Sequence, residues 1–225
     1  DRALDVVRTL EEKMPNSPVP HINRAAIKTQ KGDTEGAKAD LEKADKLLPG
    51  DALIGHSLAT IAIQRGQFDA ARKHYQQVKE KDGPSLTTLM AMYDLEVLAK
   101  QPSAARKLVE EAGNKFPKAA RPAAIIATAY VRGGQPEKAL ELSSEAAVAN
   151  PNHLELLTAR GGAYYNKGDL NAALDHFDRI VKLRPDLAEG YFKVALVHND
   201  KGNFIALRND LNHVLRLDPN HIRAR

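Results

Sequence analysis

A proline period constrains this chain more than any other feature of its sequence. A spacing of 34 residues, or of twice 34, separates Pro15, Pro49, Pro117, Pro151, Pro185 and Pro219. The one position of this series that is not proline is Gly83, which directly precedes Pro84. No insertion or deletion breaks the register. A fixed period of this length is typical of a repeat protein, in which similar units stack on one another.

Each unit predicts two helices, because a second breaker stands near its middle. Gly32-Asp33 and Gly168-Asp169 are examples: the glycine takes a left-handed conformation that ends the first helix, and the aspartate caps the second. Each helix then has about 13 residues and a length of roughly 20 Å. A lone second helix occupies residues 1–17. The full repeats follow at 18–51, 52–85, 86–119, 120–153, 154–187 and 188–221.

Small residues recur where two helices must approach closely. One position early in each second helix holds Ala37, Ala71, Ala105, Ala139 and Ala173. One position in the first helix holds Ala25, Ala59, Ala127, Gly161 and Ala195. A single hairpin of this kind cannot bury its apolar face, so we expect stability to come from stacking on the neighbouring hairpins.

These features resemble the tetratricopeptide repeat (TPR) family. The unit NPNHLELLTARGGAYYNKGDLNAALDHFDRIVKLRP matches the family positions at Gly161, Tyr164, Gly168, Ala173, Phe177 and Pro185. The resemblance covers the whole chain. It implies an all-α, right-handed superhelical solenoid of about 13 helices, with the first helices lining a concave groove.

Composition excludes several functional classes. With no cysteine among the 225 residues, the chain has no disulfide, thiolate metal site or cysteine nucleophile. No apolar run approaches the roughly 20 residues that span a bilayer. Basic and acidic residues are interleaved despite the net charge of +4, whereas nucleic-acid binders cluster positive charge on one face. We therefore expect no nucleic-acid partner and no transmembrane segment in this sequence.

Catalytic and metal motifs are also missing from the sequence. The eight histidines have scattered repeat offsets without a pair on one helix face, and no nucleophile elbow or phosphate-binding glycine motif occurs. We predict a non-enzymatic protein without a metal or cofactor.

Some residues depart from the repeat pattern. In the third repeat, Tyr93 and Glu96 replace expected residue types, and Lys100 replaces the glycine between the helices. Its methionines, Met90 and Met92, are either adaptable contacts for a partner or core residues. Arg24 and Arg160 stand where the family usually places leucine. Each arginine either reaches an acidic ligand or lays its aliphatic stem on the core.

The family geometry predicts which residues face the groove. They are expected at His56, Thr60, Gln64, Met90, Asp94, Leu98, Arg121, Thr128, Arg132, Tyr165, Asn166, Phe192 and Asn199. Such a surface suits an extended peptide or a helix of a protein partner. A generic solvated face is the alternative, with binding carried by other repeats.

A narrower resemblance points to a cellular setting. KGDTEGAKADLEKADKLLPGD, QFDAARKHYQQV and GDLNAALDHFDRIVKLRPD are similar to repeats of the PEP-CTERM system lipoproteins of Gram-negative bacteria. This resemblance implies a scaffold of an envelope system for exopolysaccharide production or protein sorting and export. The implied location is periplasmic or associated with the outer membrane, with the cytoplasm as the alternative.

Two other functions stay open from the sequence alone. Tyr165 and Phe192 are candidates for stacking on a carbohydrate polymer, and Arg121 and Arg132 for contacting RNA. The chain begins in the middle of a repeat without methionine and stops at HIRAR, where another first helix is due. We therefore expect it to be a fragment of a longer protein. The partner's identity and the oligomeric state do not follow from the sequence.

Overall fold

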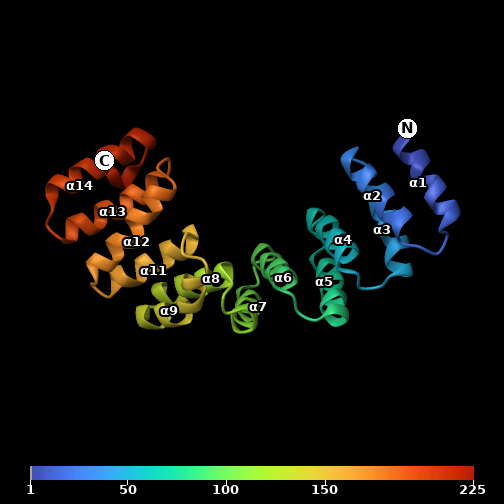
Figure 1. Ribbon diagram of the computed structural model, residues 1–225, viewed down its shortest axis with the longest axis horizontal. Helices are drawn as coiled ribbons and strands as arrows, with labels where there is room; N and C mark the ends of the chain where they lie inside the picture. Colours follow the sequence, from blue (N-terminus) through green and yellow to red (C-terminus); the bar gives the residue numbers. More distant parts are fainter. Residues whose placement is uncertain (1) are drawn as a thin grey trace. The chain divides into compact units, whose positions relative to one another are not determined.

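The computed structural model describes residues 2–225, and all of the regular secondary structure in that range is helical (Figure 1). The fourteen α-helices of the described residues are α1 (Arg2–Lys13), α2 (Val19–Gln30), α3 (Thr34–Leu47), α4 (Ala52–Gln64), α5 (Phe68–Asp82), α6 (Leu86–Leu98), α7 (Pro102–Lys115), α8 (Ala120–Arg132), α9 (Pro136–Leu142), α10 (Ser144–Ala149), α11 (Leu154–Asn166), α12 (Leu170–Leu183), α13 (Ala188–Asp200) and α14 (Phe204–Leu217). A short 3-10 helix, η1, covers Ile222–Ala224. The prediction of an all-α solenoid of helical hairpins is confirmed. The helix number exceeds the predicted 13 because one second helix is divided into α9 and α10.

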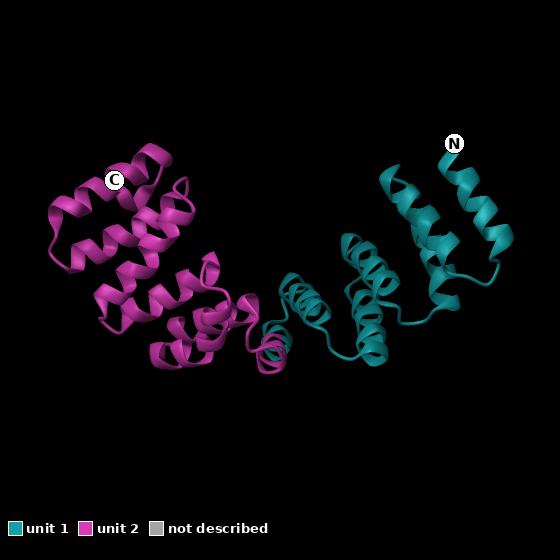
Figure 2. Cartoon of the chain, in the orientation of Figure 1, with its two compact units in different colours: residues 1–108 teal, residues 109–225 magenta. Residues whose placement is uncertain are grey.

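The chain divides into two compact units, residues 1–108 and 109–225, and the division falls within α7 (Figure 2). In the first unit, α2 packs against α3 and α4 packs against α5. In the second unit, α11 packs against α12, α13 packs against α14, and α8 packs against both α9 and α11. The predicted grouping of all repeats into a single array stays a prediction.

The hairpin turns follow the predicted chemistry. The glycine before the second helix has a positive φ in five repeats, with values from 69° to 79° at Gly32, Gly66, Gly134, Gly168 and Gly202. Aspartate or asparagine then caps the second helix in three of them. The Asp33 carboxylate accepts from the Gly36 amide at 2.8 Å, and the Asn203 side-chain oxygen accepts from the Ala206 amide at 3.2 Å. Sequence-local hydrogen bonds therefore set both ends of the turn in these three repeats.

The third repeat makes the same turn without glycine. Lys100 has φ 56°, a left-handed conformation that is unfavourable for a residue with a Cβ atom. The Gln101 amide still donates to the Glu96 carbonyl at 2.8 Å, as the Gln67 amide does to Ala62 at 2.9 Å in the preceding repeat. The helix-ending hydrogen bond is kept at the expense of backbone strain.

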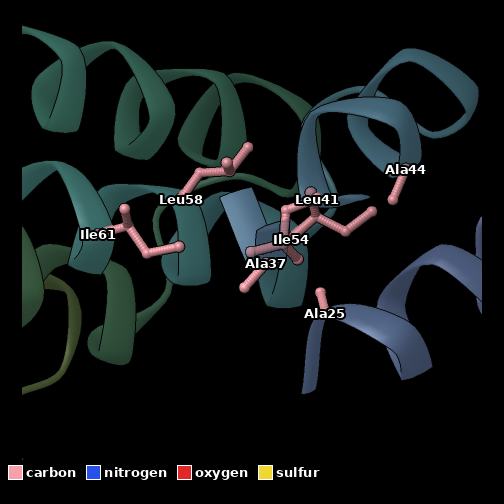
Figure 3. Close-up of a cluster of buried hydrophobic side chains, with 7 residues drawn as sticks. All are labelled: Ala25, Ala37, Leu41, Ala44, Ile54, Leu58 and Ile61. Carbon is pink, nitrogen blue, oxygen red and sulfur yellow. The ribbon is translucent and has the colours of Figure 1, made fainter. Parts of the chain in front are cut away.

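Short side chains form the close helix crossings, as the repeat pattern predicts. Ala37, Ala71, Ala139 and Ala173 have no exposed surface, and Ala105 is also buried. Figure 3 shows the cluster that joins α2, α3 and α4, where three alanines lie among larger aliphatic side chains. Its members are Ala25, Ala37, Leu41, Ala44, Ile54, Leu58 and Ile61. At Gly161, an added Cβ would lie 2.5 Å from the Phe177 ring, so only glycine fits that backbone position without a shift.

The interruption between α9 and α10 is centred on Ser143. This residue is fully buried, and its hydroxyl donates to the Ala139 carbonyl at 2.7 Å. The Arg160 guanidinium of α11 donates to the Leu140 carbonyl at 2.9 Å and to the Ser143 hydroxyl at 2.8 Å. Arg160 therefore satisfies backbone and hydroxyl oxygens at a helix break within the protein. The Arg160 guanidinium thus has its partners within the protein, an arrangement that neither of the two interpretations of this arginine described.

No helix within residues 2–225 is long and apolar enough to cross a membrane.

The strain at Lys100 generates a prediction. We expect Lys100→Gly to stabilise the protein by about 0.5–1 kcal/mol, because relief of the left-handed strain, about 1–2 kcal/mol, exceeds the entropy that glycine adds to the unfolded chain. Urea unfolding followed by circular dichroism measures the change as a higher midpoint. The matched control is Gly134→Lys, which places lysine in the equivalent turn at φ 69° and is expected to lower the midpoint. A lower midpoint for Lys100→Gly would contradict the assignment of strain.

Candidate functional surface

The first unit brings three of the predicted groove residues together around the Tyr75 side chain. The His56 ring meets the Tyr75 ring edge-on, with 5.1 Å between centroids. A hydrogen bond with Thr60 lowers the pKa of the Tyr75 hydroxyl, but burial and the nearby Asp94 carboxylate outweigh it and raise that pKa. His56, Thr60 and Asp94 therefore lie on one surface formed by α4 and α6, with Tyr75 of α5 beneath them.

His56 also links two consecutive first helices. Its Nε2 lies 3.1 Å from the Thr88 hydroxyl, which is buried in α6. Burial lowers the pKa of the His56 imidazole below its ordinary value. The neutral ring is thus the form that the folded protein favours at this position.

Exposed aliphatic side chains lie in the last turn of α6. Val97 is 53% exposed and Leu98 is 55% exposed, although both are large hydrophobic residues. Gln64 is exposed in the last turn of α4. We call the α4 and α6 surface that carries His56, Thr60, Asp94, Val97 and Leu98 the unit 1 surface. It combines an apolar part with a polar cluster.

The second unit has a polar cluster on α11 and α13. The Tyr165 hydroxyl donates to the Asp200 carboxylate, and this bond raises the pKa of Tyr165 to about 12. The Asn199 amide donates to the other Asp200 oxygen at 3.1 Å. The Asn166 amide lies 3.4 Å from the Val131 carbonyl of α8. Tyr165 and Asn199 thus meet at Asp200, whereas the Asn166 side chain contacts α8.

The remaining polar candidates lie on α8. Arg121 is exposed in its first turn and Arg132 is exposed in its last turn. Thr128 is half-buried, and its hydroxyl donates to the Ala124 carbonyl of the same helix at 2.8 Å. Because that bond uses the hydroxyl proton, Thr128 offers a partner only acceptor capacity.

Two predicted groove residues belong to the core instead. Met90 is 5% exposed, and its neighbours Thr88 and Leu89 are also buried, so α6 is covered on more than one side. Phe192 is 4% exposed and packs in a cluster with Val214 and Ala224. The placement of these two side chains at a ligand-facing surface is corrected: neighbouring helices cover Met90, and the segment after α14 covers Phe192.

Sequence reasoning missed a network of ion pairs that explains two departures from the repeat pattern. Arg24 of α2 contacts Glu11 of α1 at 2.6 Å and the buried Asp40 of α3 at 2.9 Å. Burial alone would raise the pKa of Asp40, but hydrogen bonds from Lys28 and Arg24 outweigh it and lower that pKa. Arg24 therefore has acidic partners within the protein.

Glu96 has a comparable partner in the preceding repeat. Its carboxylate receives two hydrogen bonds from the Arg72 guanidinium, at 2.7 and 2.9 Å, and the side chain of Glu96 is buried. This fork raises the pKa of Arg72 beyond its ordinary range. The sequence carried a signal for this ion pair. Glu96 stands at a position that is aromatic in other repeats, and Arg72, of opposite charge, lies on the second helix of the preceding repeat.

No group of three or more His, Cys, Asp or Glu side chains that could hold a metal ion occurs within residues 2–225.

Comparison with known proteins identifies the family to which this architecture belongs. Two family models, both described as tetratricopeptide repeat, match residues 28–93 and 126–188, together more than half of the chain. A TPR repeat-containing protein of Rhizobium etli is 38% identical over 53 residues, which span 24% of this chain and 26% of that protein. The chain thus matches only about a quarter of that relative's length.

Solved structures are similar in fold. The C-terminal part of a TPR repeat-containing protein from Cytophaga hutchinsonii has a TM-score of 0.73 and 17% identity, covering 99% of this chain and 92% of that one. YrrB, described as a TPR protein with an unusual peptide-binding site, has a TM-score of 0.52 and 18% identity, covering 99% and 97%. At such identities the similarity shows the fold alone.

The buried ion pair leads to a stability prediction. We expect Arg72→Met to destabilise the protein by about 2 kcal/mol, because it leaves the buried Glu96 carboxylate without its main partner. The double variant with Arg72→Met and Glu96→Tyr is expected to recover most of that loss, since it restores the aromatic residue type of the repeat. Urea midpoints measure both. Equal midpoints for the single and double variants would contradict the expected recovery.

The His56 environment leads to a pH prediction. The unfolded chain takes up a proton on His56 near pH 6.5, whereas the folded chain does so only at a lower pH. Stability from this residue is therefore complete above pH 6.5 and is lost as the pH falls below it, by at most about 1.4 kcal/mol per pH unit. The loss between pH 7.5 and 5.5 is expected to be smaller in His56→Gln. NMR titration measures the imidazole directly, and a pKa at or above 6.5 in the folded protein would contradict the prediction.

Proposed function

Because the chain belongs to the tetratricopeptide-repeat family, we propose that it is a non-enzymatic scaffold that holds a segment of a partner protein against its first helices. The unit 1 surface supports this proposal most directly. Val97 and Leu98 expose more than half of their surface beside the polar cluster of His56, Thr60 and Asp94. An extended peptide needs this combination, in which apolar contacts supply affinity and polar groups fix orientation.

The cluster on α11 and α13 supports the same function in the second unit. Asp200 is exposed and is held by hydrogen bonds from Tyr165 and Asn199, so its position is fixed before a partner arrives. Arg132 is exposed at the end of α8. Charged groups of both signs give a bound segment a defined direction. The fold shared with YrrB, a TPR protein with a peptide-binding site, is consistent with a peptide ligand.

The proposed setting is a bacterial envelope system for exopolysaccharide production or for protein sorting and export. Its support is the similarity of segments such as GDLNAALDHFDRIVKLRPD to the repeats of PEP-CTERM system lipoproteins. A periplasmic or outer-membrane-associated location follows from that setting and is part of the proposal.

A carbohydrate polymer is a weaker candidate ligand. Sugar recognition by stacking needs exposed aromatic faces, and Phe192 is buried. Tyr165 is half-buried and its hydroxyl is bonded to Asp200. The peptide ligand therefore has more support from the exposed side chains.

The proposal is tested by changing exposed side chains on first helices. Crosslinking in the native host identifies the partner, and calorimetry with the purified partner gives the affinity. We expect Leu98→Asp to weaken binding at least tenfold, because it places a charge in the apolar part of the unit 1 surface. Arg132→Asp tests the second unit in the same way.

Matched controls lie on second helices. Val6 of α1 is 57% exposed, close to the value for Leu98, and Arg208 of α14 is exposed like Arg132. Val6→Asp and Arg208→Asp are expected to leave the affinity within twofold of the wild-type value. If the controls weakened binding as much as Leu98→Asp and Arg132→Asp, the partner would not be held by the first helices.

A further inference from the structure

A cavity of about 610 Å³ lies within the second unit. It is bounded by the last turns of α7, by α8, and by the α9–α10 segment. Its apolar wall includes Phe116, Ala123, Ile126, Tyr130 and Leu142. A volume of this size is within the usual range for ligand sites in proteins. None of the thirteen residues predicted to face the groove lines it.

A short side chain borders this space. Ala123 of α8 lines the cavity, and so does Gly113 of α7, where an added Cβ would lie 2.7 Å from the Ile126 side chain. Two repeats later, the equivalent positions are occupied by Val181 and Tyr191, which are much larger. The equivalent of Ala123 in the next repeat is Leu157, which is buried in a core cluster. The small size of residue 123 therefore contributes to the open space, whereas Gly113 allows the close approach of Ile126.

The interruption at Ser143 forms the outer edge of the cavity. Leu142 and Ser144, on either side of the break, both line it. Because Arg160 holds the Leu140 carbonyl and the Ser143 hydroxyl, this edge has a fixed geometry. A second cavity of about 400 Å³ shares Ser144 and Glu145 with the first and continues along α10 past Val148, which is 84% exposed. The combined surface is elongated, which suits a chain-like ligand better than a compact small molecule.

Acidic groups outnumber basic groups at this surface. Glu110, Glu141 and Glu145 line the first cavity together with Lys138, and Lys118 lines the second cavity. The Lys138 ammonium lies 4.9 Å from the centre of the Tyr130 ring, so a cation already contacts the aromatic wall. Glu141 and Glu145 are exposed. A basic group on a ligand would meet complementary charge next to an apolar cavity.

We propose that this surface, lined by α7, α8, α9 and α10, binds a peptide segment that carries a basic side chain beside a large apolar side chain. The apolar side chain enters the cavity between Ala123, Ile126 and Tyr130. The basic side chain lies against Glu141 and Glu145. This site differs from the proposed first-helix surface in both its residues and its preferred ligand charge.

The probe is a phage-displayed library of random 12-residue peptides selected on the full chain. Selected peptides are synthesised with a fluorescent label, and their dissociation constants are measured by anisotropy. We expect enriched sequences to pair Lys or Arg with Leu, Ile or Phe. Glu141→Lys is expected to weaken their binding at least tenfold.

Two further variants test whether binding depends on this cavity and on the position of its acidic groups. Asp175→Lys makes the same charge change at the equivalent position of the next repeat, where Asp175 is also exposed, and it should alter the affinity less than twofold. Ala123→Leu introduces the residue of the next repeat at the cavity wall and should weaken binding at least tenfold by filling the space. Circular dichroism checks that each variant folds, and Glu141→Lys provides the test if Ala123→Leu does not fold.

Several results would overturn the proposal. They are a library without enriched sequences, enrichment of acidic peptides, or binding that Glu141→Lys leaves unchanged. Equal weakening by Asp175→Lys would show a general response to charge and would also overturn it. Peptides that lose binding with Leu98→Asp but not with Glu141→Lys would belong to the first-helix surface, and they would support the proposed function while refuting this second site.

Discussion

Close approach of helices at short side chains is the constraint on which this architecture depends. The second helix of five repeats presents an alanine that is buried against the first helix, and Gly161 lies so close to Phe177 that a Cβ atom would collide with the ring. Such crossings bring backbones near one another, so many small contacts replace a few large aromatic ones. This explains how a chain with 5% aromatic residues and no tryptophan packs the core clusters within its two units. It also means that the core is distributed, with each hairpin stabilised mainly by its neighbours.

The buried polar side chains of this core have hydrogen-bond or ion-pair partners. Asp40 is bonded by Arg24 and Lys28, Glu96 by Arg72, and Ser143 by Arg160. Burying any of these groups alone would cost several kcal/mol of desolvation, which the pairing offsets. The residues that depart most visibly from the repeat pattern therefore form hydrogen bonds and ion pairs that link helices within the protein. Candidates for recognition are the exposed side chains at ordinary repeat positions.

The proline and glycine period was sufficient to predict the helices and their turns. Local chemistry sets those features, since a positive φ and a capping side chain act within a few residues. The break at Ser143 was not predictable in the same way. Neither proline nor glycine marks it, and it depends on an arginine 17 residues away in the next repeat. The left-handed Lys100 is a related case, in which stacking imposes a turn that the residue itself disfavours.

Burial of individual candidates depended on still longer-range packing. Family geometry assigns Met90 and Phe192 to the groove, but α6 is covered on several sides and Phe192 lies beneath His221 and Arg223. The position of a residue within its repeat predicts the direction in which its side chain points. Whether the side chain is exposed depends on the residues of neighbouring helices. The same reasoning applies to the cavity at Ala123, whose offset is ordinary and whose walls come from several helices.

Helix α8 has a particular place in the second unit, because it contributes to both proposed surfaces. Ala123, Ile126 and Tyr130 line the cavity, whereas Thr128 and Arg132 are among the predicted groove residues. At 100° per residue, positions 123 and 132 lie on opposite sides of the helix. Because α8 packs against α9 and α11, its two sides are presented by one helix held between neighbours. The two proposed surfaces therefore use opposite sides of one first helix, and the small side chain at position 123 contributes to the open space on the second side.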